Sequence, residues 1–213
     1  MKKRVLDITI ALLIGVAVAF SGCSAQGDNK VNNGNDAPAD PSELDGGMVE
    51  ISFDFKKQSG HASNQFAVWI AYQNGDFLDT IYATEFTAEG GFKNRPDSIS
   101  NWTKISGLNQ MTKEEVDTIT GPTPKEGRLT FTWDMIYDDG SRVPPGKYIV
   151  YVEGSLRWKN SVIYSAVIDT EAGETTIEAD REFIFEGNDD QPALDENSDE
   201  AGMIGPVTIK FIP

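Results

Sequence analysis

Apolar and polar residues alternate with a period of two along much of the chain, the pattern of strands with one buried face. The clearest case is residues 128–153, where Phe131 and Trp133 alternate with threonines. Residues 147–153 are apolar on both faces, which is typical of a central strand. We therefore predict that Trp133 and Tyr148 are core residues.

Turn signals separate these strands. Pro145 fixes φ for the second position of a turn and Gly146 accepts positive φ at the third, so both are assigned to the structural core. The sequence Asn74-Gly75-Asp76 predicts a tight primed hairpin turn with positive φ at both central residues.

Eight strands are expected, at residues 51–55, 65–72, 77–83, 128–133, 147–153, 161–169, 174–185 and 207–211. The seventh is expected to form a hairpin with the sixth across Gly173. Because strands and helices do not alternate regularly, we predict an all-β fold. The expected architecture is one immunoglobulin-like antiparallel β-sandwich over residues 48–213.

Residues 84–123 interrupt the β pattern, and a short helical insertion is expected near residues 92–120. A helix starting at the Pro-Asp-Ser sequence places three apolar residues on one stripe: Ile99, Trp102 and Ile105. A second helix follows a capping box formed by Thr112 and Glu115. Insertions of this length on a β scaffold are common locations of binding sites.

The N-terminus carries an export signal. Three basic residues precede an apolar run over residues 8–20, and small residues precede Cys23. The run is shorter than the roughly 20 residues of an ordinary spanning helix. We predict a lipoprotein signal peptide over residues 1–22, lipid modification of Cys23 and a flexible tether over residues 23–47. The protein would then be anchored in the cell membrane or outer membrane, facing the periplasm or the cell exterior.

The chain has 213 residues and a formal net charge of −16, which argues against nucleic acid as a partner. Its one cysteine excludes disulfides within the chain and thiolate zinc clusters. The one histidine, His61, lies in a polar stretch and is expected to be solvated. No phosphate-binding glycine loop or nucleophile elbow is visible, so no catalytic or metal-binding residues are assigned and no enzymatic activity is expected.

Carboxylates gather in two places. The acidic loop at residues 186–202 is dense enough to suggest calcium binding, but it lacks the glycine of an EF-hand loop, so a solvated loop is favoured. Asp138 and Asp139 suggest paired catalytic carboxylates, but their position before Gly140 favours a turn whose side chains bind local amides.

Four tryptophans offer stacking surfaces for a sugar or a ring cofactor. Core packing accounts for Trp133 and Trp69, whereas Trp102 and Trp158 are expected to be exposed. These two residues support a weaker, glycan-binding hypothesis.

The chain combines Trp133-Asp134, Asp139-Gly140 and the Val-Pro-Pro-Gly-Lys-Tyr sequence at residues 143–148 with the strand at residues 66–70. This combination resembles the immunoglobulin-like module of flagellar hook-capping proteins. It is more similar still to the predicted periplasmic family DUF2271, over about residues 65–185. The resemblance implies the sandwich fold and a location outside the cytoplasm, and it implies no activity.

Residues 117–123 resemble the acceptor motif of exported flavin-carrying proteins, although Pro122 stands where that motif has alanine. The matching residues are Asp117, Thr120, Gly121 and Thr123. The resemblance implies that a flavin transferase attaches FMN through its phosphate to the hydroxyl of Thr123. Trp102, in the same insertion, is then a candidate to stack on the flavin ring.

Three functions remain open. The first is a membrane-anchored lipoprotein that binds or scaffolds a protein or small-molecule partner outside the cytoplasm without catalysis. The second is a redox accessory protein that carries covalent FMN, and the weaker third is a glycan-binding module. Absorbance of the natively produced protein in the flavin band distinguishes the first two.

Overall fold

The computed structural model describes residues 47–59, 64–157, 159–184, 194–199 and 201–213. Some predicted features lie outside these residues: Cys23 and the tether, His61, Trp158 and much of the acidic loop. Within the described part of the chain, no helix is both long and apolar enough to cross a membrane.

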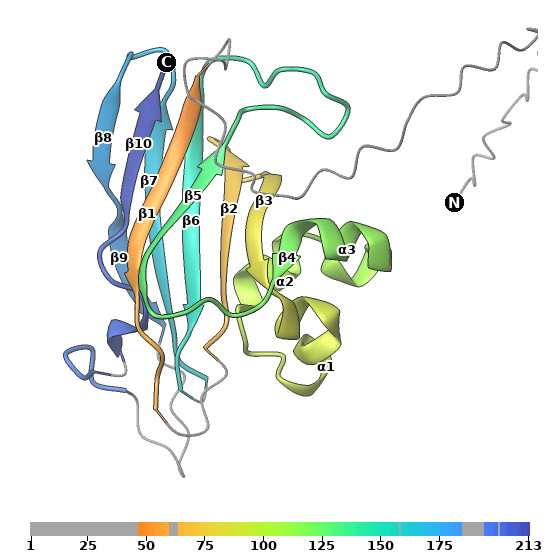
Figure 1. Cartoon of the computed structure of the whole chain (residues 1–213), viewed down its shortest axis with the longest axis vertical. Coiled ribbons are helices and arrows are strands. Elements are labelled where there is room, and N and C mark those ends of the chain that lie inside the picture. Colours follow the sequence, from red (N-terminus) through yellow and green to blue (C-terminus); the bar gives the residue numbers. More distant parts are fainter. Residues whose placement is uncertain (1–46, 60–63, 158, 185–193, 200) are drawn as a thin grey trace, which may run out of the picture. The chain divides into compact units, whose positions relative to one another are not determined.

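Ten strands in the described residues form two sheets (Figure 1). The smaller sheet has the order β5 (Gly127–Trp133), β1 (Met48–Phe55), β10 (Thr208–Ile212) and β8 (Thr175–Glu178). The larger has the order β4 (Thr120–Gly121), β3 (Phe77–Thr84), β2 (Phe66–Tyr72), β6 (Lys147–Ser155), β7 (Ser161–Asp169) and β9 (Asp180–Ile184). Paired strands are antiparallel except β3 and β4. The predicted all-β sandwich is confirmed.

The structure has more strands than the eight expected because one predicted strand divides between the sheets. Residues 174–185 separate at Ala179 into β8, which pairs with β10, and β9, which pairs with β7. The predicted hairpin with β7 therefore forms only along β9. The other additional strand is β4, two residues long.

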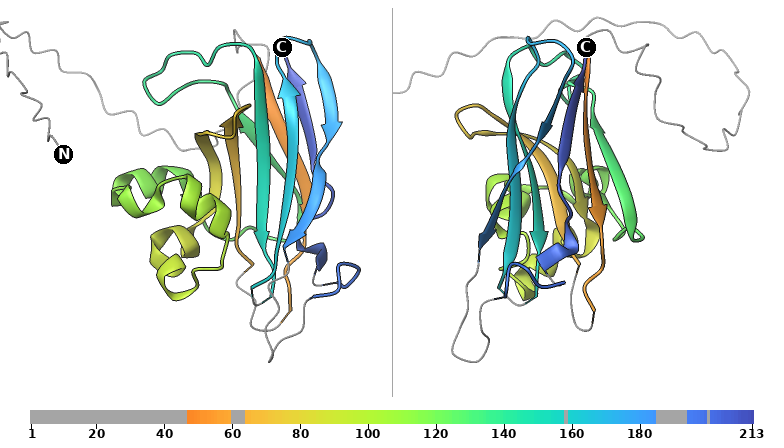
Figure 2. Two further views of the ribbon diagram at one scale, coloured as in Figure 1. Left: turned by 180° about the vertical axis from the view of Figure 1, so that it is seen from behind. Right: turned by 90° about the vertical axis from the view of Figure 1, so that its left-hand side faces the viewer.

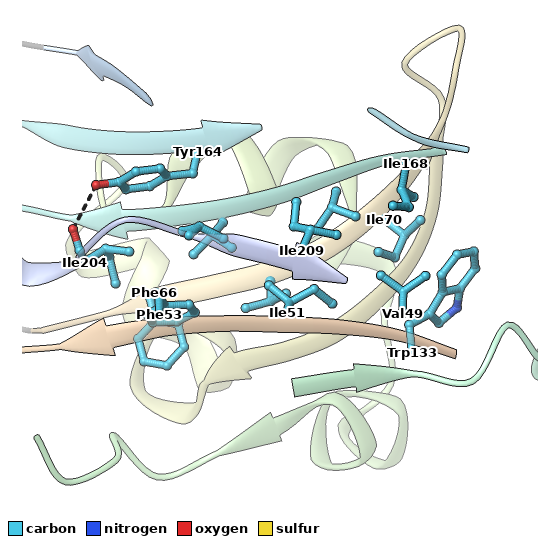
Figure 3. Close-up of a cluster of buried hydrophobic side chains, with 14 of the residues drawn as sticks. Val49, Ile51, Phe53, Phe66, Ile70, Trp133, Tyr164, Ile168, Ile204 and Ile209 are labelled. Atoms are coloured by element: carbon cyan, nitrogen blue, oxygen red, sulfur yellow. Dashed lines mark hydrogen bonds between the residues drawn. The ribbon is translucent and has the colours of Figure 1, made fainter. Parts of the chain in front are cut away.

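The main core lies between the two sheets (Figure 3). Val49, Ile51 and Phe53 of β1 are fully buried there, as are Phe66 and Ile70 of β2. The rings of Phe53 and Phe66 meet edge to face, with their centroids 5.6 Å apart. The alternating pattern thus produces a continuous apolar layer, the main source of stability in such folds.

The residues assigned to the structural core divide into two groups. Trp133 and Tyr148 are 2% and 5% exposed and contact each other with ring centroids 5.3 Å apart. Pro145 is exposed, Gly146 is half-buried, and Gly146 does not have positive φ, so the assignment of these two was wrong. The segment approaches β6 as a bend instead of a tight turn, because two hydrogen bonds join Gly146 to Thr170. The carbonyl of Gly146 accepts from the N–H of Thr170, and the N–H of Gly146 donates to Thr170 Oγ1, both at 2.9 Å.

The hairpin between β2 and β3 is present, but its turn differs from the prediction. Only Gly75 has positive φ, at 90°, and Asn74 does not. The N–H of Gly75 donates to the carbonyl of Tyr72 at 2.9 Å, and the Asn74 side chain accepts from the N–H of Asp76 at 3.1 Å. This local side-chain bond lets Asn74 keep ordinary backbone angles.

The residues between β3 and β4 form the helical insertion, which packs on the outer face of the larger sheet at β2 and β3 (Figures 1 and 2). Its elements are the π-helix η2 (Thr87–Gly91), α1 (Phe92–Asn94), α2 (Ser100–Ile105), the 3₁₀-helix η3 (Leu108–Gln110) and α3 (Lys113–Ile119). A second apolar core lies beneath them and consists of Ala67, Trp69, Ala83, Ala88, Ile99, Trp102, Leu108 and Val116.

Two expectations for the insertion can be compared with the structure. The capping box before α3 is confirmed, since the N–H of Glu115 donates to Thr112 Oγ1 and the N–H of Thr112 donates to the Glu115 carboxylate. The stripe on α2 is buried at Ile99 and Trp102, but Ile105 is 39% exposed. The prediction for Ile105 was wrong because α2 ends at this residue, at the margin of the second core.

Candidate functional site

Glu153 of β6 holds the helical insertion on the sheet. Its carboxylate is fully buried and accepts hydrogen bonds from Asn101 N (3.3 Å), Asn101 Nδ2 (3.0 Å) and Trp102 N (2.9 Å). The residue before α2, Ile99, supplies no side-chain cap, so the strand provides the acceptor for the first turn of the helix. Burial raises the pKa of Glu153, and these hydrogen bonds offset part of that rise.

Trp102 is fully buried in the second core, so the prediction that it is exposed was wrong. Its indole N–H donates to Thr80 Oγ1 at 2.9 Å. Trp69 is 3% exposed and stacks on Tyr151, with ring centroids 5.0 Å apart. Neither tryptophan presents a ring to a sugar or a flavin. The glycan-binding hypothesis therefore retains only Trp158, which lies outside the described residues.

The flavin-type motif spans the end of α3 and the approach to β5. Asp117 is exposed, and Thr120 donates its hydroxyl to the carbonyl of Val116 at 2.9 Å. Thr123 is half-buried, and its hydroxyl accepts from Gln65 Nε2 at 3.4 Å. The motif thus runs from α3 through β4 into the loop that follows. The hydroxyl of Thr123, which would accept the flavin, already has Gln65 as a hydrogen-bond partner.

Gly121 occupies its position because a side chain would not fit there. An added Cβ would lie 2.9 Å from the ring of Tyr82. The hydroxyl of Tyr82 also donates to the carbonyl of Pro122 at 2.7 Å. This contact holds the segment just before Thr123 against β3.

A first hollow of about 430 Å³ lies within the insertion, between η2, α1 and α3. Charges of both signs line it, from Glu89 and Asp117 and from Lys93 and Lys113. Opposite charges so close together largely neutralise each other at an exposed surface.

A second, larger hollow of about 570 Å³ lies between β3 and α3, and we call it the β3–α3 groove. It is lined by Phe77, Leu78, Asp79, Thr80, Met111, Glu114, Glu115, Thr118, Ile119 and Asp138. The lining combines apolar side chains with four carboxylates, and no lysine or arginine of the described residues belongs to it. Small-molecule sites typically have this size and this combination of apolar surface with a few polar groups.

Asp79 is half-buried, whereas the other three carboxylates of the groove are exposed. Burial raises the pKa of Asp79, and the negative charge of Asp138 adds to the rise, whereas the N–H of Thr80 lowers it. Asp138 comes from the loop after β5, which was predicted to be a turn with locally bonded side chains. Asp139 fits that prediction, since its carboxylate accepts from Ser141 N at 2.8 Å, but Asp138 lines the groove.

Trp133 lines a smaller cavity of about 40 Å³ next to the groove, together with Leu78, Asp79 and Asp138. Its indole N–H is buried and has no hydrogen-bond partner among the described residues. Buried donors without an acceptor are uncommon in native proteins, and the indole N–H of Trp69 in the second core is another among the described residues.

Comparison with known proteins gives one match. The profile of the family described as "Predicted periplasmic protein (DUF2271)" matches residues 47–184. This chain belongs to that family. No curated protein and no solved structure matches it significantly. Membership of this periplasmic family places the protein outside the cytoplasm, and the match includes the sandwich strands through β9, the insertion and the groove.

In this DUF2271 protein, the described end of the acidic loop uses its carboxylates locally. Asp195 accepts from Asn197 N at 2.9 Å, and Asp199 forms an exposed ion pair with Lys56 at 3.5 Å. Among the described residues, no group of three or more His, Cys, Asp or Glu side chains could hold a metal ion.

Sequence reasoning missed Asp79 and Glu153, and it assigned Asp138 to a turn instead of a hollow. Asp79 and Glu153 share one signal, because each is the single acidic residue of a mostly apolar strand. A charge at such a position needs a partner or a solvent-filled hollow. Asp138 has no comparable signal, since an Asp-Asp-Gly sequence is common in turns.

Proposed function

We propose that this DUF2271 protein is a membrane-anchored binding module outside the cytoplasm, and that the β3–α3 groove is its ligand site. The observation that carries the proposal is the hollow of about 570 Å³, which the described residues line with apolar side chains and four carboxylates but with no basic side chain. Its walls come from β3 and from α3, and Val116 of α3 is buried in the second core beneath the insertion. A perturbed carboxyl such as Asp79 in a concave, largely apolar site is the usual sign of a binding site.

The anchoring part of the proposal rests on the N-terminal sequence. The apolar run ends at Cys23, the one cysteine of the chain, and a polar segment separates it from the first strand. Lipid attached to Cys23 would keep the groove near a membrane surface.

A fragment screen tests the binding function. The full chain is screened by ligand-observed NMR against a library of neutral, cationic and anionic compounds. Thr118→Trp fills the groove from α3 and should abolish most hits. Thr176→Trp makes the same change at an exposed position of β8, in the other sheet, and should leave the hits unchanged. Hits that survive Thr118→Trp, or a library without hits, would contradict the proposal.

Covalent attachment of FMN is a second candidate function. The observation that favours it is the position of Thr123, half-buried on the loop after β4 with the exposed Asp117 of the same motif on α3. A bond would form between Thr123 Oγ and the FMN phosphorus. The hydroxyl proton would pass to a base of the transferase, and the leaving group of the flavin donor would depart from that phosphorus. Trp102 would take no part, because it is buried.

Intact-mass analysis after co-expression with an exported flavin transferase tests this candidate. One FMN should be added to the wild-type chain and to Thr118→Ala, a change within the same motif, but not to Thr123→Ala. An unmodified wild-type mass would exclude the redox function.

A further inference from the structure

We infer that the β3–α3 groove binds an organic cation, an ammonium group carried on an apolar body. This inference rests on the proposed function, because it names the ligand class of the same groove. Two features of the groove lead to it, the sign of its charges and the nature of the surface between them.

The charges of the groove come from two walls. Asp79 of β3 and Asp138 of the following loop lie on one, and Glu114 and Glu115 of α3 lie on the other. In the part of the chain that the structure describes, no basic side chain lines the space between them. The hollow inside the insertion differs, because Lys93 and Lys113 line it with its acids. The groove is therefore a local concentration of negative charge in a concave surface, which attracts cations.

Asp79 distinguishes the groove from an ordinary acidic surface. The residue is half-buried, and the neighbouring Asp138 disfavours its ionisation further. Such a carboxylate is costly when unpaired and gains when a cation binds beside it. Asp79 and Asp138 also line the adjoining small cavity, together with Trp133, whose buried indole N–H has no partner among the described residues.

The apolar lining determines which kind of cation fits. The four carboxylates do not converge into a group that could hold a metal ion, within the part of the chain that the structure describes. Phe77, Met111 and Ile119 form apolar surface between the acidic walls. An ammonium ion with a hydrocarbon or aromatic body matches both the charge and this surface, and 570 Å³ lies within the usual range for such ligands.

Calorimetric titration with three compounds of the same shape tests the inference. The compounds are 4-phenylbutylamine, 4-phenylbutan-1-ol and 4-phenylbutyrate, added to the full chain at low and at moderate ionic strength. The amine should bind at least about tenfold more tightly than the alcohol, because a charge-assisted hydrogen bond adds about that factor. The carboxylate compound should not bind, and the higher ionic strength should weaken the binding of the amine.

Substitutions identify the charge that acts. Asp79→Asn should reduce amine affinity by about tenfold and leave alcohol binding unchanged. This change removes a half-buried charge, so the variant should fold at least as well as the wild type. Asp180→Asn, the same change at an exposed position of β9, should have no effect.

The outcomes separate this inference from the function on which it rests. Equal binding of the amine and the alcohol, or preferred binding of the acid, would overturn the cation while keeping the groove as a binding site. If none of the three compounds binds and the fragment screen also fails, the proposed function itself is overturned.

Discussion

Replacing Glu153 with alanine should release the helical insertion from the sheet. The change removes the acceptor of three hydrogen bonds, two of them donated by backbone N–H groups in the first turn of α2. No side chain at Ile99 can take over this role. Hydrogen bonds to a charged acceptor contribute about 1.5–3 kcal/mol each, but part of that gain is offset by the cost of burying the carboxylate. We expect the free energy of unfolding to fall by about 2–4 kcal/mol, a large share of the stability of an ordinary domain.

Two measurements test this loss of stability. Urea unfolding at neutral pH gives the total change, and amide hydrogen exchange shows where protection is lost. Exchange should accelerate in α2 and α3, while the amides of β6 and β7 keep most of their protection. Glu178→Ala, the same change at an exposed strand position, is the control. Unchanged stability together with unchanged protection of α2 would refute the role given to Glu153.

The pH dependence gives an independent check. Because burial raises the pKa of Glu153, the folded chain binds a proton there more tightly than the unfolded chain does. The stability that this group contributes is fully present below its unfolded pKa and decreases as the pH rises through the folded pKa. The difference in the free energy of unfolding between the wild type and Glu153→Ala should therefore become smaller from acidic to neutral pH. A difference that widens over this range would mean that the folded pKa is lowered.

Three other changes follow from the structure and the sequence. Trp133→Ala should lower the free energy of unfolding in urea by about 3–5 kcal/mol, because it leaves a cavity in the core beside Tyr148. A melting temperature close to that of the wild type would show that Trp133 is not in the core. Gly121→Ala should lower stability by about 1–3 kcal/mol, because its Cβ would press on the ring of Tyr82; normal stability would indicate that the ring moves freely. Cys23→Ser should shift the protein from the membrane fraction to the soluble fraction or block its processing, and unchanged fractionation with a normal N-terminus would disprove lipid anchoring.

The sandwich could be predicted because its signal is local. Alternation in β1 and β5 identifies a buried face from neighbouring residues alone, and the capping box before α3 depends on residues three positions apart. Turn geometry was less predictable. Gly146 forms a bend because Thr170, far away in the sequence, pairs with it.

The candidate site could not be predicted, since it depends on contacts between distant segments. The apolar stripe predicted for α2 includes Trp102. Its complete burial depends on how the insertion packs on the sheet, which the sequence of the helix does not determine. Asp79 and Asp138 are 59 positions apart in the sequence and meet at one groove because β3 passes beside the loop after β5. A single acidic residue inside a mostly apolar strand is the sequence signal that could have identified Asp79 and Glu153.

Amide chemical-shift mapping of the ¹⁵N-labelled full chain with the strongest hit of the fragment screen tests the central claim most directly. If the β3–α3 groove is the ligand site, the largest shifts should occur at Leu78, Asp79, Thr118 and Ile119, on both walls, and should disappear in Thr118→Trp. Shifts centred on the strands of the smaller sheet, or on η2 and α1, would contradict the account.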